Sequence, residues 1–256
     1  MAAGHRWQNL GDEYLRLFVA TYQNDGKVHW PTLVSSLGAL SGEALLLSGA
    51  VEMPESGVIE SERISELMYS AESPAGSVYG YGALLAEHAF NVKPETLFSY
   101  EDALKRVGHT LLPGHFPDFD IPINLAPRET PLFAGQRNRR AVNRVAAQRN
   151  ANSQDQAFAM MTAAMKAVGF AEKVWIPHLT NLTLQSAVAG SRFVPLLQLP
   201  RIPTEHHISD LFEIMQGGAG IEPPEASRRS ADEAGTTDAE AEMIQDSPKP
   251  GFGRRK

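Results

Sequence analysis

The chain of 256 residues contains no cysteine. This absence excludes disulfide bonds, thiolate metal sites, iron–sulfur clusters and a cysteine nucleophile. The sequence also lacks a phosphate-binding P-loop, the glycine pattern of dinucleotide-binding proteins and the G-x-S-x-G turn of the serine hydrolases. These absences remove several classes of enzyme and leave no catalytic motif of high specificity.

Long apolar runs are absent as well. The longest apolar-rich stretch, residues 33–51, contains four serines and Glu43, so it is too polar to span a membrane unaided. Residues 1–18 lack the pattern of a secretory signal, because Asp12 and Glu13 interrupt it. A hydrophobic content of 43% and a charged content of 21% are ordinary for a globular protein. These features predict a soluble, cytoplasmic protein.

Basic residues are the scarcer charged type: 23 lysines and arginines face 30 aspartates and glutamates, which gives a net charge of −7. This balance argues against coating of nucleic acid, which needs a broad basic surface. Residues 135–152 are the exception, because they contain no acidic residue and five arginines: Arg137, Arg139, Arg140, Arg144 and Arg149. We expect them on one amphipathic helix, with Val142 and Val145 facing inward.

The arginine cluster has three interpretations. Guanidinium groups suit carboxylates and phosphates, so our hypothesis is a non-enzymatic interaction or regulatory protein that binds an acidic partner. RNA or DNA binding is the alternative, with Asn138, Asn143 and Gln148 as neutral hydrogen-bonding groups. The third interpretation is ion pairing within the chain, because a run of charge is usually a solvated face.

A metal-dependent enzyme is a further alternative. His109, His115, Asp118 and Asp120 carry groups that Zn²⁺ or Fe²⁺ accepts, but their spacing matches no common ligand pattern. Residues 114–117 read GHFP and resemble the histidine motif of the hot-dog-fold acyl-thioester dehydratases. The resemblance implies an acid/base role for His115. The sequence departs from that family after Pro122, where no glycine follows, and we expect no cofactor.

The spacing of apolar residues predicts a mainly α-helical fold with a minor β-hairpin. Helices are expected over residues 10–22, 31–45, 61–68, 78–90, 99–107, 137–149, 153–168, 179–188 and 204–215. Ser99 with Asp102, and Ser153 with Gln156, form capping patterns that predict the starts of two of these helices. Residues 50–60 hold two short alternating runs around Gly57 and are expected to form the hairpin. An α+β arrangement stays open, because the threonines of residues 179–188 also allow a strand.

Composition divides the chain into four parts. We expect an N-terminal helical lobe with the hairpin over residues 1–112 and a C-terminal helical lobe over residues 132–218. Residues 113–131 contain five prolines and are expected to cross between the lobes in an extended form. Residues 219–256 are expected to be a disordered tail, because residues 221–256 hold eight acidic residues, six basic residues and one aromatic residue.

Residues 37–42 read LGALSG. Gly38 and Gly42 are four residues apart on one helical face, which predicts close packing against a neighbouring element. The region of residues 30–90 resembles a set of uncharacterised bacterial proteins in which an LGALxG helix precedes a hairpin. The resemblance implies a helix followed by a hairpin and brings no activity with it. The oligomeric state stays open.

Overall fold

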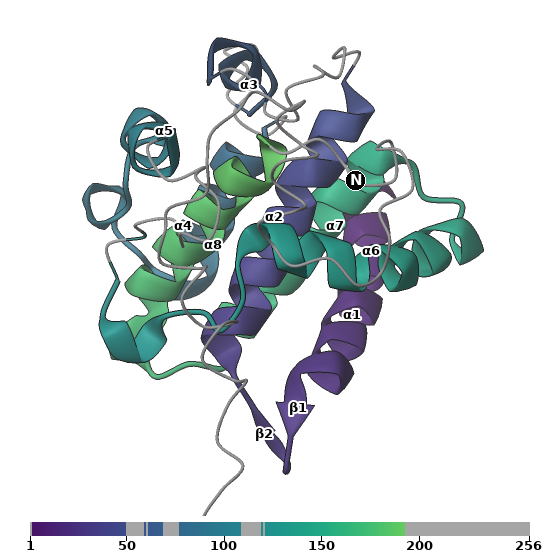
Figure 1. Cartoon of the computed structure of the whole chain (residues 1–256), viewed down its shortest axis with the longest axis horizontal. Helices are drawn as coiled ribbons and strands as arrows, with labels where there is room; N and C mark the ends of the chain where they lie inside the picture. The colour runs from purple at the N-terminus through teal and green to yellow at the C-terminus, as the bar shows by residue number, and fades with distance from the viewer. Residues whose placement is uncertain are drawn as a thin grey trace, which may run out of the picture. The chain divides into compact units, whose positions relative to one another are not determined.

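The fold is mainly α-helical with one minor β-hairpin, as the sequence predicts (Figure 1). The computed structural model describes residues 2–49, 59, 61–68, 77–108, 119 and 121–192. The helices are α1 (Ala2–Tyr22), α2 (Trp30–Ser48), α3 (Ser61–Met68), α4 (Val78–Phe90), α5 (Tyr100–Gly108), α6 (Pro131–Gln148), α7 (Ser153–Val168) and α8 (Ile176–Ser191). The strands are β1 (Gln23–Asn24) and β2 (Lys27–Val28), and short 3-10 turns lie at Pro94–Thr96, Ile123–Leu125 and Lys173–Trp175.

Helix α2 is the centre of the fold. Every residue from Pro31 to Leu46 is buried, because α2 packs against α1, α6, α7 and α8 (Figure 1). A helix that is apolar all round is typical of a core position. Its few polar side chains have partners inside the protein: Ser41 Oγ, for example, donates to the carbonyl of Ala157 at 2.6 Å.

Helices α2 and α8 approach each other at backbone distance. A Cβ atom added at Gly42 would lie 1.8 Å from the carbonyl oxygen of Ala187, and one added at Gly190 would lie 1.9 Å from that of Ala39. Only glycine therefore fits at these two positions. The close packing expected from Gly38 and Gly42 is confirmed.

Two helix caps test the local predictions. The Oγ atom of Ser99 accepts a hydrogen bond from the amide of Asp102 at 3.1 Å, as the sequence predicts for the start of α5. Helix α7 begins at Ser153 as expected, but its cap is the preceding residue. The Oδ1 atom of Asn152 accepts from the amide of Asp155 at 2.7 Å, because an N-cap residue bonds the amide two or three positions on.

The minor hairpin lies between α1 and α2. Strands β1 and β2 pair antiparallel, and the turn residues Asp25 and Gly26 have φ values of 50° and 76°. Positive φ at both turn positions gives the two-residue hairpin turn that Asp-Gly favours. The hairpin expected at residues 50–60 lies outside the described residues, apart from Ile59, and so do the helix expected at residues 204–215 and the tail.

The helices expected in two separate lobes share one core. Helix α2, from the N-terminal range, packs mainly against α7 and α8, from the C-terminal range. All described residues belong to one compact unit, Met1–Ala219, and the second unit, Gly220–Lys256, is outside them. None of the described helices combines the length and the apolar character that crossing a membrane requires.

Candidate functional site

Helix α6 carries the arginine cluster and is held on the body by its apolar face. It begins at Pro131, and the Oγ1 atom of Thr130 accepts a hydrogen bond from the amide of Phe133 at 3.4 Å. Ala134, Val142 and Ala146 are buried against the core. The five arginines are therefore presented by a fixed helix, but they do not share one environment.

Arg139 points into the protein and pairs with Glu43 of α2. Its Nε and Nη2 atoms donate to the two carboxylate oxygens of Glu43 at 2.7 and 2.6 Å. Arg139 is 7% exposed and Glu43 is 8% exposed. Two parallel charge-assisted hydrogen bonds of this length are the strongest arrangement open to this pair. This burial removes Arg139 from the binding surface that the sequence predicts.

Gly135 of α6 leaves space for the buried Arg139–Glu43 pair. A Cβ atom added at Gly135 would lie 3.0 Å from the Oε2 atom of Glu43, so a larger residue there would press on the carboxylate. Sequence reasoning missed Glu43 as a partner. The signal was present, because Glu43 is the one charged residue in the apolar-rich stretch of residues 33–51, and a charge in an apolar helix requires a partner when buried.

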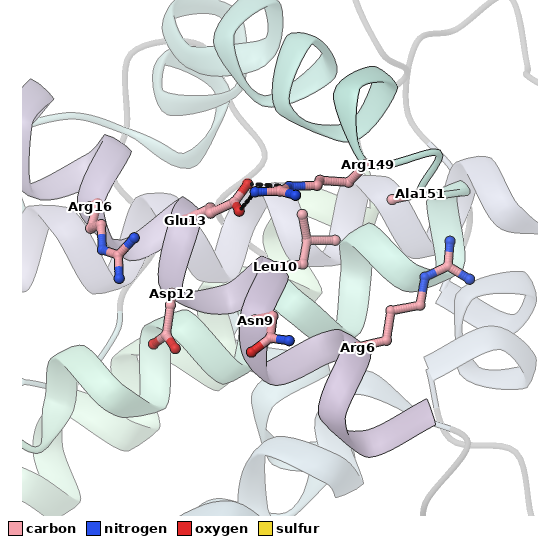
Figure 2. Close-up of a pocket in the computed structure, with 8 residues that line it drawn as sticks. All are labelled: Arg6, Asn9, Leu10, Asp12, Glu13, Arg16, Arg149 and Ala151. Carbon is pink, nitrogen blue, oxygen red and sulfur yellow. Dashed lines mark hydrogen bonds and ion pairs between the residues drawn. The ribbon is translucent and has the colours of Figure 1, made fainter. Parts of the chain in front are cut away.

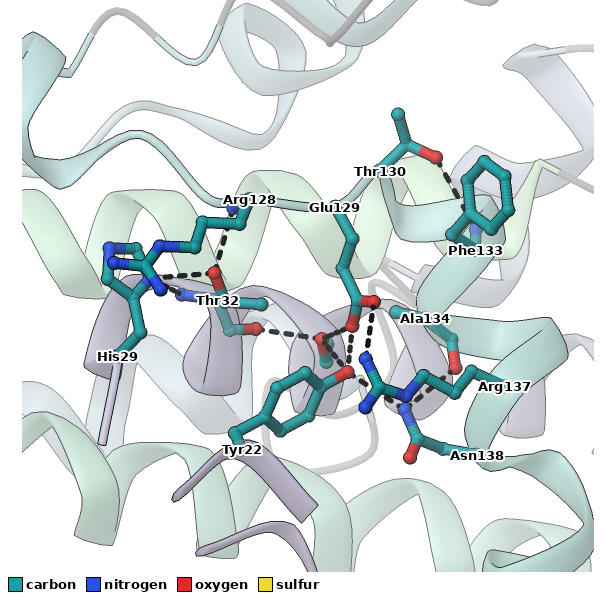
Figure 3. Close-up of polar contacts among 11 residues, drawn as sticks. Tyr22, His29, Thr32, Arg128, Glu129, Thr130, Phe133, Ala134, Arg137 and Asn138 are labelled. Carbon is teal, nitrogen blue, oxygen red and sulfur yellow. Dashed lines mark hydrogen bonds and ion pairs between the residues drawn. The ribbon is translucent and has the colours of Figure 1, made fainter. Parts of the chain in front are cut away.

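Arg137 lies at the edge of a polar cluster between α1, α2 and α6 (Figure 3). Its Nη1 atom is 3.5 Å from the Oε2 atom of Glu129, and its guanidinium lies over the ring of Tyr22 at 5.3 Å. The carboxylate of Glu129 also accepts hydrogen bonds from the hydroxyls of Tyr22 and Ser36, and Asn138 donates to the Tyr22 hydroxyl at 2.9 Å. Burial raises the pKa of Glu129, and the charge of Arg137 opposes that rise.

The segment before α6 is anchored to the start of α2 (Figure 3). The amide of Arg128 donates to the Oγ1 atom of Thr32 at 2.8 Å, and His29 caps α2 by accepting from the amide of Thr32 at 3.4 Å. Burial, followed by the charge of Arg128, lowers the pKa of His29. His29 is therefore neutral at pH 7, as a ring nitrogen that accepts a hydrogen bond must be.

Arg149, at the end of α6, pairs with Glu13 of α1 (Figure 2). Its Nε atom donates to Glu13 Oε2 at 3.0 Å, and its Nη2 atom donates to the second carboxylate oxygen. These hydrogen bonds and the charge of Glu13 raise the pKa of Arg149. Arg149 is exposed, but its charge is already matched within the chain.

A pocket of about 400 Å³ opens beside this ion pair (Figure 2). Arg6 from its lining pairs with Asp155 at 3.1 Å, and Asp12 from its lining pairs with Lys166 at 2.6 Å. Both acidic and basic side chains line the opening, and Arg6, Asp12, Glu13 and Arg149 are each in an ion pair. This mixed lining gives the pocket no clear preference for an anion or a cation.

Arg140 and Arg144 are the two arginines of the cluster without a partner. Both are exposed, and neither makes an ion pair or a hydrogen bond to the described part of the chain. They are four residues apart on the outer face of α6, with Arg137 three residues before Arg140. We call these three residues, Arg137, Arg140 and Arg144, the arginine stripe.

The alternative metal site cannot be placed in the structure. His109, His115, Asp118 and Asp120 all lie outside the described residues. Within the residues that the structure describes, no group of three or more histidine, aspartate or glutamate side chains is arranged to hold a metal ion.

Comparison of the chain with models of protein families, with curated proteins and with solved structures finds no match. No related protein supplies a function, so the geometry of the described residues carries the proposals below.

Proposed function

We propose that the protein is a non-enzymatic interaction or regulatory protein that binds an acidic protein partner through the arginine stripe of α6. One observation carries the proposal. Arg139 and Arg149 are paired within the chain, whereas Arg140 and Arg144, on the same helix, are exposed and have no partner among the described residues. Two like charges one turn apart destabilise a helix by roughly 0.2–0.5 kcal/mol, a cost that an acidic partner would remove.

The position of α6 favours such a contact. Its inner face is fixed by buried residues and by the Arg139–Glu43 pair, so the backbone that carries the stripe is ordered before a partner arrives. Preorganisation lowers the entropy lost on binding. The planar guanidinium group matches a carboxylate through two parallel hydrogen bonds, which gives orientation as well as attraction.

Arg137 contributes at the end of the stripe. Its ion pair with Glu129 is long, at 3.5 Å, and its side chain is 56% exposed. Such a pair is weak in water and leaves most guanidinium donors available. A partner carboxylate can therefore contact Arg137 without breaking the buried part of the Glu129 cluster.

The overall charge of the chain restricts the partner. The net charge of −7 repels an acidic molecule at long range, and the stripe is a local basic exception that would orient the partner before contact. The same net charge disfavours nucleic acid, because three arginines neutralise few phosphates. We therefore propose an acidic protein surface and treat nucleic acid as an outcome of the test. We place the interaction in the cytoplasm as part of the same proposal.

The test is fluorescence anisotropy with the full chain and two probes, a labelled hexaglutamate peptide and a single-stranded oligonucleotide of six phosphates. Arg140→Ala with Arg144→Ala should weaken peptide binding by at least about tenfold, which corresponds to roughly 1.4 kcal/mol. The matched control is Arg16→Ala with Arg63→Ala, because both arginines are exposed and lie on other helices.

Equal losses in the two double variants would show that net charge alone attracts the peptide, and the proposal would fail. Tighter binding of the oligonucleotide, with a steep loss of affinity as salt increases, would favour nucleic acid instead. A pull-down with the same variants then identifies the partner, which should be lost with Arg140→Ala and Arg144→Ala and kept with the control.

A further inference from the structure

A second buried arginine, Arg192, lies directly after α8. It is 9% exposed, and its Nε atom donates to the carbonyl oxygen of Ile59 at 3.2 Å. The amide of Ile59 donates back to the carbonyl of Arg192 at 2.9 Å. The Nη1 atom of Arg192 is buried and has no hydrogen-bond partner among the described residues. The Ile59 carbonyl thus satisfies Nε, and Nη1 is left without an acceptor there.

No carboxylate neutralises Arg192 within the described part of the chain. Ile59 shortly precedes α3, and α5 packs on α8, so the acidic residues of α3 and α5 are the first candidates (Figure 1). These are Glu62, Glu66, Glu101 and Asp102. All four are exposed, and none forms an ion pair with Arg192.

The charge of Arg192 cannot be removed by deprotonation. Burial lowers its pKa from the ordinary value, but a guanidinium remains protonated at neutral pH. Tyr100 is close enough for the two charges to interact. Burial raises the pKa of Tyr100 more than Arg192 lowers it, so its hydroxyl stays neutral and supplies no negative charge. The carbonyl end of α8 offers only a partial charge.

The two buried arginines therefore differ in one respect. Arg139 is buried to the same degree as Arg192, and both oxygens of a carboxylate bind it. Buried charges are normally paired, because an unpaired charge loses its hydration without replacement. For Arg139, the carboxylate of Glu43 replaces the lost hydration. For Arg192, the replacement must come from a group outside the described residues.

We propose that Arg192 binds a small oxyanion, the phosphate or carboxylate group of a ligand, between the end of α8 and the residue that shortly precedes α3. The planar guanidinium presents the unused Nη1 donors to the anion, while the Ile59 carbonyl holds the Nε side in place. This site is separate from the arginine stripe, which is exposed and lies on α6.

The test uses the full chain with inorganic phosphate and with acetate, each measured against sodium chloride at the same ionic strength. Isothermal titration should show saturable binding near one ion per chain, and the thermal midpoint should rise by about 2–4 °C at saturation. A response to phosphate alone identifies a phosphate group as the ligand feature, and a response to acetate alone identifies a carboxylate.

Arg192→Met should abolish the binding, and Arg192→Lys should weaken it about tenfold, because an ammonium group lacks the planar pair of donors. The lysine variant keeps the test decisive if the methionine variant does not fold. Arg16→Met is the matched control and should bind like the unmodified protein, because Arg16 is exposed on α1 and lies outside both proposed sites. Arg144→Met is made as well, to test whether the ion binds the arginine stripe instead. Glu60→Gln is made as well, because Glu60 follows Ile59 in the chain.

Three results would overturn the proposal. The first is the absence of any response to phosphate or acetate beyond that to chloride. The second is binding that is lost with Arg144→Met but kept with Arg192→Met, which would assign the ion to the arginine stripe. The third is a protein that binds oxyanions only after Glu60→Gln, which would show that a carboxylate of the chain itself occupies the site.

Discussion

Helices α6 and α8 both pack against α2, and each is associated with one buried arginine, but within the described residues only one of these arginines has an anionic partner. Arg139 of α6 is bound by both oxygens of Glu43. Arg192, at the end of α8, has one hydrogen bond from its side chain to the Ile59 carbonyl and leaves Nη1 unsatisfied.

The difference separates an arginine that links two helices through a carboxylate from one whose side chain bonds a backbone carbonyl. Helix α6 meets α2 through the Arg139–Glu43 pair. Helix α8 meets α2 through small residues, with Gly42 and Gly190 allowing contact between backbones. A buried polar atom without a partner among the described residues calls for an explanation, and a bound ion is one.

The largest effect on stability is expected at the Arg139–Glu43 pair. Glu43→Gln leaves the buried charge of Arg139 without a carboxylate, so the free energy of unfolding should fall by about 3–5 kcal/mol in urea denaturation. Glu43→Met combined with Arg139→Met removes both charges and should recover most of that loss. A double variant as unstable as Glu43→Gln would show that the pair contributes by its shape rather than by its charge.

The same substitution at both arginines sharpens the comparison. Arg139→Met leaves the carboxylate of Glu43 buried and unpaired, and should cost about 3–5 kcal/mol. In buffer without oxyanions, Arg192→Met removes an uncompensated charge and should change stability by less than about 1 kcal/mol in either direction. Urea unfolding of the two variants measures both changes in the free energy of unfolding. Equal losses would contradict the proposal that Arg139 is neutralised within the protein and Arg192 is not.

A smaller effect is expected from Glu129, and it depends on pH. Burial raises its folded-state pKa above the ordinary 4.5, so the folded protein binds the proton more readily than the unfolded chain does. Its contribution to stability is complete below about pH 4.5 and is lost as the pH rises through the folded-state value.

Glu129→Gln is permanently neutral and should avoid this loss. The stability of the variant relative to the unmodified protein should therefore increase between pH 4.5 and 7, as followed by urea unfolding at several pH values. A relative stability that decreases over this range would mean that the Arg137 pair outweighs the burial of the carboxylate.

The smallest effect is expected at the stripe. Arg140→Ala with Arg144→Ala removes exposed side chains without partners in the described residues, so the free energy of unfolding should change by no more than about 0.5 kcal/mol. Thermal unfolding of this double variant, measured together with the destabilised Glu43→Gln variant, tests the prediction. A large loss would show that these arginines support the fold, and would weaken the case for a binding surface.

The sequence predicted the helices well where local signals were strong. Apolar spacing located α4 at Val78–Phe90, and the Ser99–Asp102 capping pattern located the start of α5. The hairpin between α1 and α2 was missed for a physical reason. Asp25-Gly26 is a strong turn signal, but strands of two residues are too short to show alternation.

The candidate sites were less predictable, because they depend on residues far apart in the chain. Glu43 and Arg139 are 96 positions apart, and Ile59 and Arg192 are 133 positions apart. The cluster of arginines was visible in the sequence, but its division into buried, paired and exposed members was not. That division depends on which face of α6 meets α2, and only tertiary packing determines it.

The burial of α2 also has a consequence during synthesis of the chain on the ribosome. Its partners α7 and α8 begin more than a hundred residues after it ends. At roughly 5–20 residues per second, synthesis of α8 follows that of α2 by roughly 6–30 seconds. During that time α2, in which every residue from Pro31 to Leu46 is buried in the folded protein, can contact α1 but lacks α7 and α8. The serines along α2, which form hydrogen bonds in the folded core, interrupt the apolar surface that α2 exposes before α8 is synthesised.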